Sequence, residues 1–238
     1  MASSIVDMLK AARELAHQEG YNFNGDVYLS GYSEGGYATM AAHKEMEENP
    51  VAGLNLKASA PSSGGYDVKG MQEYFVSLET YPQPYYLAYV ALSYKNVYGW
   101  SDPMSTFFQE PYATDLPGYF DGSKSGSDIN ALLTDVVADY LQPEFQLNAD
   151  IDPTFSKIVD AFEENSLDEW VPTKTMYMYH GNADDWVPFQ NSVDTYDNFM
   201  RLGASSNTVT FTAIEGATHS TGFGPYLIDA VKKFDALK

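Results

Sequence analysis

A glycine-rich turn between a strand-like segment and a helical segment constrains this chain more than any other feature. Residues 26–30 form a short apolar segment of β type, and residues 31–36 follow with the sequence Gly-Tyr-Ser-Glu-Gly-Gly. A helical pattern at about 35–48 comes next and ends at Asn49-Pro50. In this setting the pattern Gly-x-Ser-x-Gly predicts a sharp turn that presents the Ser33 hydroxyl at the N-terminus of a helix.

The two glycines of this pattern stand two residues before and two residues after Ser33. A serine at the tip of such a turn needs a strained backbone. We expect side chains at Gly31 and Gly35 to collide with the neighbouring helix and strand. The exposed hydroxyl then lies where the helix dipole favours a developing negative charge. The pattern predicts a nucleophile at Ser33, and a plain turn that joins strand to helix is the alternative.

Strands and helices alternate over both ends of the chain. Strand patterns cover 26–30, 54–60, 175–179 and 208–214. Helical patterns cover 3–19, about 35–48, about 188–202 and about 224–237. This alternation is typical of an α/β protein, in which helices flank a parallel sheet. We predict an α/β core formed by residues 1–60 and 174–238.

The segment 61–173 interrupts this alternation. Its first half is rich in tyrosine, and helical patterns appear at about 69–79, 84–97, 127–139 and 153–165. We interpret 61–173 as a helical, aromatic-rich cap inserted after the second strand. The aromatic side chains either fill the cap's own small core or line a pocket for a substrate with an apolar end.

A serine hydroxyl needs a general base, and the chain has four histidines. We assign His219 as the base, because it lies in a loop of small residues just beyond the fourth strand. His17 and His43 lie within predicted helices and are expected to be surface or packing residues. His180 ends the third strand, and we expect it to shape the loop that follows.

The base in turn needs an acid, which fixes its tautomer and stabilises the imidazolium. The loop after the third strand offers Asp184 and Asp185. We choose Asp184 and keep Asp185 as the alternative. Ser33, Asp184 and His219 then all follow the C-terminal ends of strands in one sheet, so the three side chains can converge.

The order serine, aspartate, histidine is that of the α/β-hydrolases. Residues 29–40 resemble the nucleophile region of bacterial secreted lipase/esterase-like hydrolases, which are distantly similar to the fungal secretory lipase family. The loop 180–188 is similar to the acid loop of many esterases and of prolyl-oligopeptidase-like peptidases. The resemblance implies hydrolysis of carboxylic esters through an acyl-serine intermediate, without a cofactor. It also implies a secreted or periplasmic location, although residues 1–7 do not show the pattern of a signal peptide.

Members of this family have about four further strands before the helix that corresponds to 3–19. We therefore expect a truncated α/β-hydrolase fold with the last four of the usual eight strands. The strand at 26–31 would then be an open sheet edge, which favours a homo-oligomer or pairing with a separate chain. The backbone N–H of Glu34 is the expected oxyanion donor. The loop that supplies the second donor in the family has no counterpart here, so we expect impaired or substitute oxyanion stabilisation.

The composition excludes several other classes of function. The chain has 13 basic and 33 acidic residues, hence a net charge of −20, which argues against binding of nucleic acid. It has no cysteine and no apolar run long enough to span a membrane. The loop 121–128 faintly resembles a calcium loop, but Leu132 stands where a glutamate is required and Lys124 opposes a cation. We predict no metal site.

These observations together predict a serine carboxylesterase or lipase-like hydrolase. Tyr32, Trp186 and the cap aromatics are expected to shape its substrate pocket. Two alternatives remain open: a catalytically impaired hydrolase-fold protein that binds a ligand or partner, and a serine peptidase of the same fold.

Overall fold

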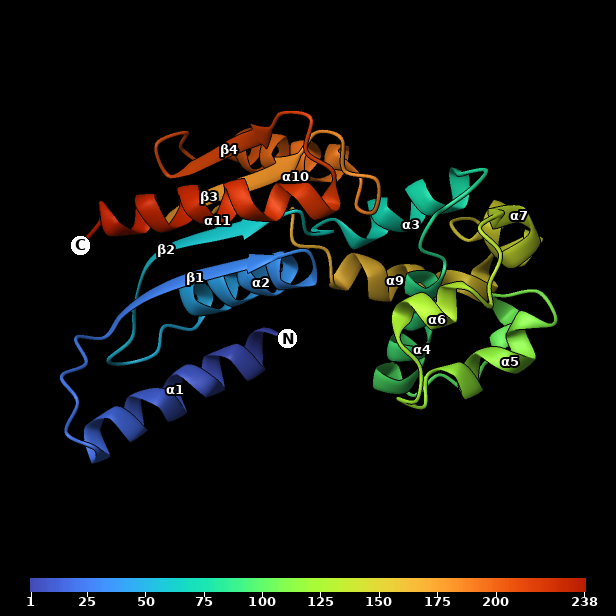
Figure 1. Cartoon of the computed structure of the whole chain (residues 1–238), viewed down its shortest axis with the longest axis horizontal. Coiled ribbons are helices and arrows are strands. Elements are labelled where there is room, and N and C mark those ends of the chain that lie inside the picture. The colour runs from blue at the N-terminus through green and yellow to red at the C-terminus, as the bar shows by residue number, and fades with distance from the viewer. The chain divides into compact units, whose positions relative to one another are not determined.

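The computed structural model describes all 238 residues, which form two compact units (Figure 1). Met1–Val68 and Asn165–Lys238 make up the first unit, and Lys69–Glu164 make up the second. The second unit is narrower at both ends than the cap of residues 61–173 that the sequence predicts. Every residue assigned above to the candidate site belongs to the first unit.

A four-stranded parallel sheet forms the centre of the first unit. Its strands lie in the order β1-β2-β3-β4. Their bounds are Asp26–Tyr32, Asn55–Ser62, Thr175–Gly181 and Val209–Ile214. The predicted α/β fold with a parallel sheet of four strands is therefore confirmed. Because β1 pairs only with β2, it forms one edge of the sheet.

Helices cover both faces of this sheet (Figure 1). These helices are α1 (Ala2–Gln18), α2 (Glu34–Glu48), α10 (Phe189–Leu202) and α11 (His219–Asp235). On one face, α2 packs on β1 and β2, α10 packs on β3 and β4, and α1 packs on α2. On the other face, α11 packs against all four strands.

The side chains of β3 explain why both faces are covered. Successive residues of a strand point to opposite faces. Met176 and Met178 are fully buried in a cluster that includes Phe199 of α10. Tyr179 packs instead against Tyr226 of α11. A strand that is apolar on both sides requires a helix on each side. The two layers of helices hold the strand in place, and with it the strand end that carries the site residues.

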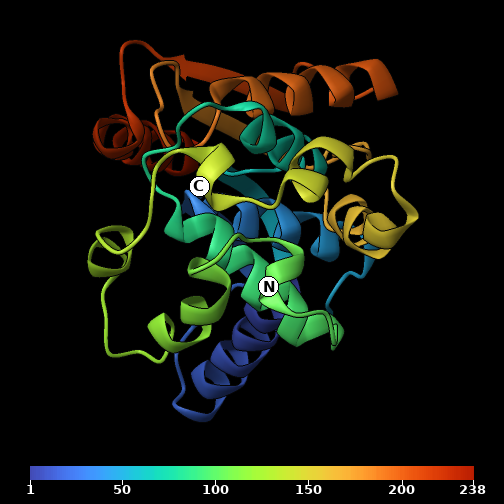
Figure 2. The ribbon, with the colours of Figure 1, turned by 90° about the vertical axis from the view of Figure 1, so that its right-hand side faces the viewer.

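The second unit consists of short helices without a strand (Figure 2). Its helices are α3 (Val68–Ser77), α4 (Tyr85–Tyr98), α5 (Tyr112–Tyr119), α6 (Gly126–Asn130), α7 (Val137–Tyr140), α8 (Pro143–Asn148) and α9 (Ser156–Glu164). Two 3₁₀ turns, Met104–Thr106 and Pro153–Phe155, complete it. The predicted helix at 127–139 is thus two short helices, α6 and α7, with a non-helical connection between them.

Aromatic side chains of the second unit pack largely against one another. Phe145 contacts both Phe107 and Phe155 edge to face, and Tyr140 lies against Phe108 and Tyr112. Much of the tyrosine and phenylalanine content therefore builds the unit's own core. None of the helices in the chain combines the length and the hydrophobicity that a membrane span requires.

Candidate functional site

Ser33 stands at the junction between β1 and α2. Its backbone has φ 60° and ψ −125°, a combination that costs free energy for any residue other than glycine. The backbone N–H of Ser33 donates to the carbonyl oxygen of Ser62 at 2.9 Å, which ties the turn to the end of β2. The sharp strand-to-helix turn expected from the sequence is thus present, with Ser33 at its tip.

The glycines around Ser33 do not contribute as we expected. A Cβ on Gly31 would lie 2.0 Å from the carbonyl oxygen of Gly35, so this position must be glycine. A Cβ on Gly35 would meet nothing within 4 Å, so the expected collision at Gly35 is wrong. The second close approach is at Gly36, where a Cβ would lie 2.2 Å from the carbonyl oxygen of Ser62. The first turn of α2 rests on the end of β2 at Gly36, because the helix turns Gly35 away from the strand.

His219 is the first residue of α11 rather than part of a free loop. The helix begins about five residues before the predicted start, because the Thr218 side chain accepts from the backbone N–H of Thr221 and caps it. The first two turns of α11 contain Gly222, Gly224 and Pro225. These residues weaken the helical pattern in the sequence, which explains why the predicted start is too late. A base on a capped helix is held more firmly than one on a loop.

Three of the predicted site residues form one hydrogen-bonded chain. The Oγ atom of Ser33 lies 2.9 Å from Nε2 of His219, and Nδ1 of His219 lies 2.7 Å from Oδ2 of Asp184. The Asp184 side chain is fully buried, and that of His219 is 6% exposed. Asp185, the alternative acid, approaches the backbone N–H of His219 at 3.5 Å and not its ring. This arrangement can take a proton from the hydroxyl and stabilise the imidazolium that results.

Asp184 is held by four donors. Its Oδ1 atom accepts the backbone N–H groups of Trp186 and Val187, each at 2.9 Å. Burial by itself raises the pKa of Asp184. The hydrogen bonds from His180, from His219 and from the two backbone N–H groups outweigh burial and hold the pKa well below its ordinary value. The carboxylate is therefore ionised at neutral pH and faces the imidazole as an acceptor.

Sequence reasoning missed one contact in this cluster. His180 is completely buried, and its Nε2 atom lies 3.2 Å from Oδ2 of Asp184. We expected His180 only to shape the loop. The spacing of four residues between His180 and Asp184 is the signal that could have indicated the contact, since the loop turns back on the end of β3.

Tyr32 and Trp186, which we expected to shape a substrate pocket, both touch His219. The Trp186 ring stacks on the imidazole with centroids 4.9 Å apart and an angle of 23° between the planes. The Tyr32 ring lies 5.3 Å from the imidazole, and its hydroxyl donates to the backbone carbonyl of His219 at 2.7 Å. Burial raises the pKa of Tyr32. Both side chains hold the histidine in place, and their contact with substrate remains a prediction.

Glu34 is the first residue of α2 and directly follows Ser33. The helix itself does not use the N–H of its first residue. No carbonyl of the helix accepts this N–H, and its role as an oxyanion donor remains a prediction.

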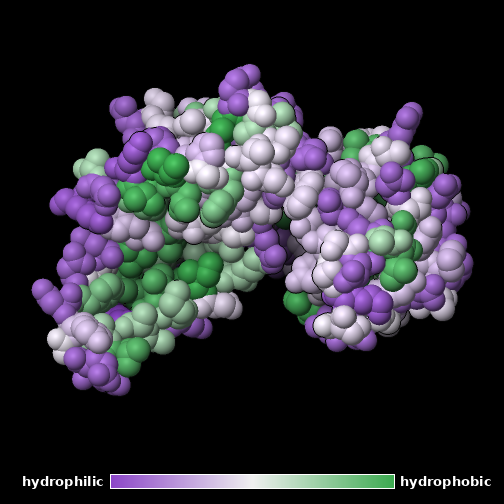
Figure 3. All heavy atoms as spheres, in the orientation of Figure 1, coloured by the Kyte–Doolittle hydropathy of each residue, from purple (hydrophilic) through white to green (hydrophobic).

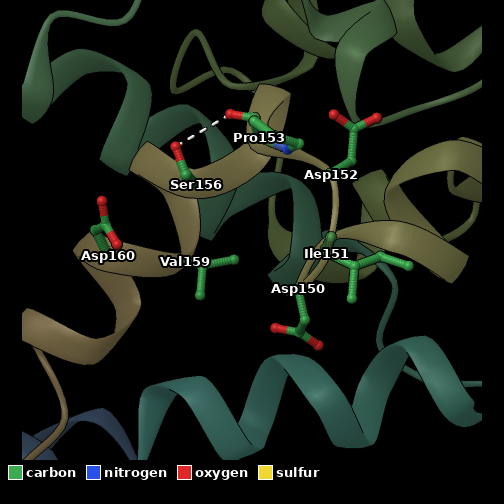
Figure 4. A pocket seen from close by; sticks show the side chains of 8 residues that line it. Asp150, Ile151, Asp152, Pro153, Ser156, Val159 and Asp160 are labelled. Atoms are coloured by element: carbon green, nitrogen blue, oxygen red, sulfur yellow. Dashed lines mark hydrogen bonds between the residues drawn. The ribbon is translucent and has the colours of Figure 1, made fainter.

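The rest of the chain offers few other sites. No three acidic or histidine side chains are grouped so that they could hold a metal ion. In the calcium-like loop, Asp121 and Asp128 accept from neighbouring backbone N–H groups. A pocket of about 290 Å³ in the second unit is lined by Asp150, Asp152, Asp160 and apolar neighbours (Figure 4). It contains none of the residues of the hydrogen-bonded chain.

Comparison with solved structures shows that the fold of this chain is similar to that of known hydrolases. The esterase LipA from Xanthomonas oryzae, which degrades the rice cell wall, is similar with a TM-score of 0.84 and 24% identity. This match covers 100% of the present chain and 65% of LipA. A suspected hydrolase from Legionella pneumophila has a TM-score of 0.85 and 26% identity, over 98% of this chain and 62% of that one.

A more distant likeness is to lipase A from Candida antarctica, with a TM-score of 0.69 and 16% identity over 96% of this chain and 52% of the lipase. The chain thus spans less than two thirds of the length of these structures. No protein-family model and no curated protein matches the sequence significantly. The chain has the α/β-hydrolase fold, in a form with four parallel strands, and is similar in structure to lipases and esterases of that fold.

Proposed function

We propose that this protein is a serine hydrolase that cleaves carboxylic esters through an acyl-serine intermediate. The observation that carries the proposal is the continuous chain from Oγ of Ser33 through both ring nitrogens of His219 to Asp184, at 2.9 and 2.7 Å. These distances are within the reach that proton transfer requires. The similarity to esterases supports a hydrolase but does not identify a substrate.

The proposed reaction has two half-cycles, and in each of them His219 acts first as base and then as acid. Nε2 of His219 takes the Ser33 proton while Oγ attacks the ester carbonyl carbon, and the carbonyl oxygen gains negative charge beside the N–H of Glu34. Nε2–H then donates the proton to the leaving alcohol as the carbon–oxygen bond breaks, which leaves the acyl-serine. Water attacks the acyl group while Nε2 of His219 takes its proton, and Nε2–H returns that proton to Oγ of Ser33 as the acyl–oxygen bond breaks, which releases the acid and regenerates Ser33.

Asp184 and Trp186 assist this proposed cycle through His219. The buried carboxylate accepts from Nδ1–H and stabilises the transient imidazolium. The stacked Trp186 ring shields one face of the imidazole from water and stabilises its cationic form further. Tyr32 fixes the backbone of the histidine, so the imidazole does not have to be reoriented during the cycle.

For the substrate we propose esters of small or medium acyl chain, with Tyr32 and Trp186 beside the acyl group. Action outside the cytoplasm is also proposed, from the resemblance to secreted family members. The test is a series of p-nitrophenyl esters from acetate to decanoate on the wild type and on Ser33→Ala. Release of p-nitrophenol by the wild type at least 10³ times faster than by the variant is the expected result. Equal rates would end the assignment of Ser33.

A fluorophosphonate probe tests the two alternatives. Covalent labelling at Ser33 is expected, since the probe needs an activated serine. No labelling and no turnover would favour a binding protein on a hydrolase fold. Cleavage of aminoacyl-p-nitroanilides without ester cleavage would favour a peptidase.

We also propose that the first unit associates through its open sheet edge with a second copy of the chain. Exposed apolar side chains occur on α1 and α11, among them Met8, Leu15, Ile228 and Val231, and Figure 3 shows apolar surface on this side of the unit. Light scattering at micromolar concentration should give twice the mass of the chain, and Ile228→Lys should reduce it. A wild type that stays monomeric over the whole concentration range would refute this association.

A further inference from the structure

The acid loop contains a second histidine that the proposed reaction does not use. We propose that His180 is a positioning residue for the acid: its Nε2–H donates to the same carboxylate oxygen of Asp184 that accepts from His219, and it thereby sets the basicity of His219. This inference rests on the proposed function and extends it to a residue that touches no substrate. It follows from the contacts of the His180 ring.

The contacts of His180 determine its tautomer. Nε2 lies 3.1 Å from the backbone carbonyl of Val187 and 3.2 Å from Oδ2 of Asp184. A carbonyl and a carboxylate only accept, so Nε2 must carry a hydrogen atom. Nδ1 lies 2.6 Å from the Ser192 hydroxyl, which can donate to it. The ring therefore directs its Nε2–H towards Val187 and Asp184.

The surroundings of His180 are buried and nearly free of charge. Both His180 and Asp184 have fully buried side chains. The remaining neighbours are neutral: the Ser192 hydroxyl, the Val187 carbonyl and the edge-on Phe189 ring at 5.7 Å. The one charged group in contact with His180 is Asp184, and His219 lies on the other side of that carboxylate. His180 contacts neither Ser33 nor His219, so it acts on the chemistry through Asp184 and the loop that holds it.

Sharing of Oδ2 between two histidines has a definite electrostatic consequence. Each donor stabilises the ionised carboxylate and draws electron density from Oδ2. When His180 donates, less of that density is available to the Nδ1–H of His219, and the imidazolium of His219 is stabilised less. Removal of the His180 donor should therefore raise the pKa of His219. The acidic limb of the pH profile should then move to higher pH, because the base must be neutral to accept the serine proton.

The chain contains a matched control for the purely structural role of such a histidine. His43 is also fully buried, with Nδ1 2.7 Å from the Ser59 hydroxyl and Nε2 2.7 Å from Glu47, four residues along the chain. The arrangement of serine, histidine and carboxylate is thus the same as at His180. Glu47, however, has no contact with His219, so loss of His43 changes stability without changing the base.

The experiment compares His180→Leu, His180→Gln and His43→Leu in the full chain. The Leu variants remove the ring donors, whereas the Gln amide at position 180 keeps an N–H₂ group that can reach both Val187 and Asp184. The readouts are kcat and KM for p-nitrophenyl acetate from pH 5 to 9 and the NMR titration of the His219 ring. The NMR titration needs no turnover, so it separates failure of this inference from failure of the proposed esterase activity.

For His180→Leu we expect the acidic limb and the His219 titration to move up together by roughly half to one pH unit. We expect kcat to fall about three- to tenfold with KM within twofold of the wild type, since no substrate contact is lost. His180→Gln should have an acidic limb and a His219 titration close to those of the wild type. His43→Leu should lose thermal stability and leave the titration unchanged.

An unshifted His219 titration in His180→Leu would overturn the inference, whatever the activity. Equal shifts in His180→Leu and His43→Leu would also overturn it, because the effect would then be general loosening. If His180→Leu does not fold, Ser192→Ala decides the question. This variant leaves Nδ1 of His180 without the Ser192 donor, and an unshifted His219 titration in it would overturn the inference.

Discussion

The contact between Gly36 and the end of β2 allows a sharp test of how the nucleophile turn is built. Alanine at position 36 would place its Cβ 2.2 Å from the carbonyl oxygen of Ser62, where ordinary contact begins at 3.4 Å. Alanine at position 35 would meet nothing within 4 Å. Adjacent glycines in the same helical turn should therefore respond to the same substitution with opposite sign.

The magnitudes follow from these distances. At Gly36 the helix and strand must separate by 3.4 − 2.2 = 1.2 Å, and the displaced Ser62 carbonyl is the one that accepts the N–H of Ser33. Overpacking of this kind costs about 1–3 kcal/mol, and we expect about 3 kcal/mol because backbone must move. At Gly35 alanine should stabilise the helix by about 0.5–1 kcal/mol. In a chain of this length, 1 kcal/mol corresponds to roughly 2–4 °C in Tm.

Thermal unfolding followed by circular dichroism measures both variants. Gly36→Ala should lower Tm by roughly 6–12 °C, and Gly35→Ala should raise it by roughly 1–4 °C. A displacement of about 1 Å at Ser33 should also reduce ester turnover about a hundredfold in Gly36→Ala. Equal Tm values for the two variants, or a lower Tm for Gly35→Ala alone, would refute the geometry of α2 on β2.

Three further predictions concern charge and stacking. Asp184→Asn places an amide nitrogen opposite Nδ1 of His219 and selects the wrong tautomer, so kcat for p-nitrophenyl acetate at pH 7 should fall on the order of 10⁴-fold; a loss below tenfold would contradict the assignment. Trp186→Ala removes the ring stacked on His219 and should lower kcat/KM about tenfold, whereas Trp186→Phe should retain most of it. Burial raises the pKa of Glu47, but hydrogen bonds from neighbouring groups outweigh burial and lower the pKa to about 2. The ionised Glu47 therefore stabilises the folded state by about 3 kcal/mol above pH 4.5, and this stabilisation is lost as the pH falls to 2. Urea titrations at several pH values should show this fall in the free energy of unfolding for the wild type and not for Glu47→Gln.

Local sequence patterns were enough to predict the strands and the order of the elements. Alternating strands and helices indicate a parallel sheet, because only helical crossovers connect parallel neighbours. The strands at 26–30, 54–60, 175–179 and 208–214 were predicted to within two residues at each end, since each is a short β-type run bounded by turn residues.

Patterns failed at the start of one helix and in the middle of another. The start of α11 depends on the Thr218 cap, and the glycines and proline that follow hide it. The break between α6 and α7 shows the same limit in the second unit, where a continuous helical pattern over 127–139 gave way to two short helices.

The candidate site was also predicted only in part from the sequence. The residue types and their positions after strand ends indicated that Ser33, Asp184 and His219 could meet, because the C-terminal ends of parallel strands share one edge of the sheet. The distances between them, the contact of His180 with Asp184 and the stacking of Trp186 on His219 come only from the folded chain.

The amino-acid sequence by itself determined the class of fold and the three side chains that could act together, since both depend on local patterns and chain order. The tertiary structure alone decided that Gly36, and not Gly35, must lack a side chain, and that two histidines share one carboxylate oxygen. The physical reason is that these features depend on distances of about 2–3 Å between groups that only folding brings together. These distances are set by how helices, strands and loops pack, and residue spacing along the chain does not fix them.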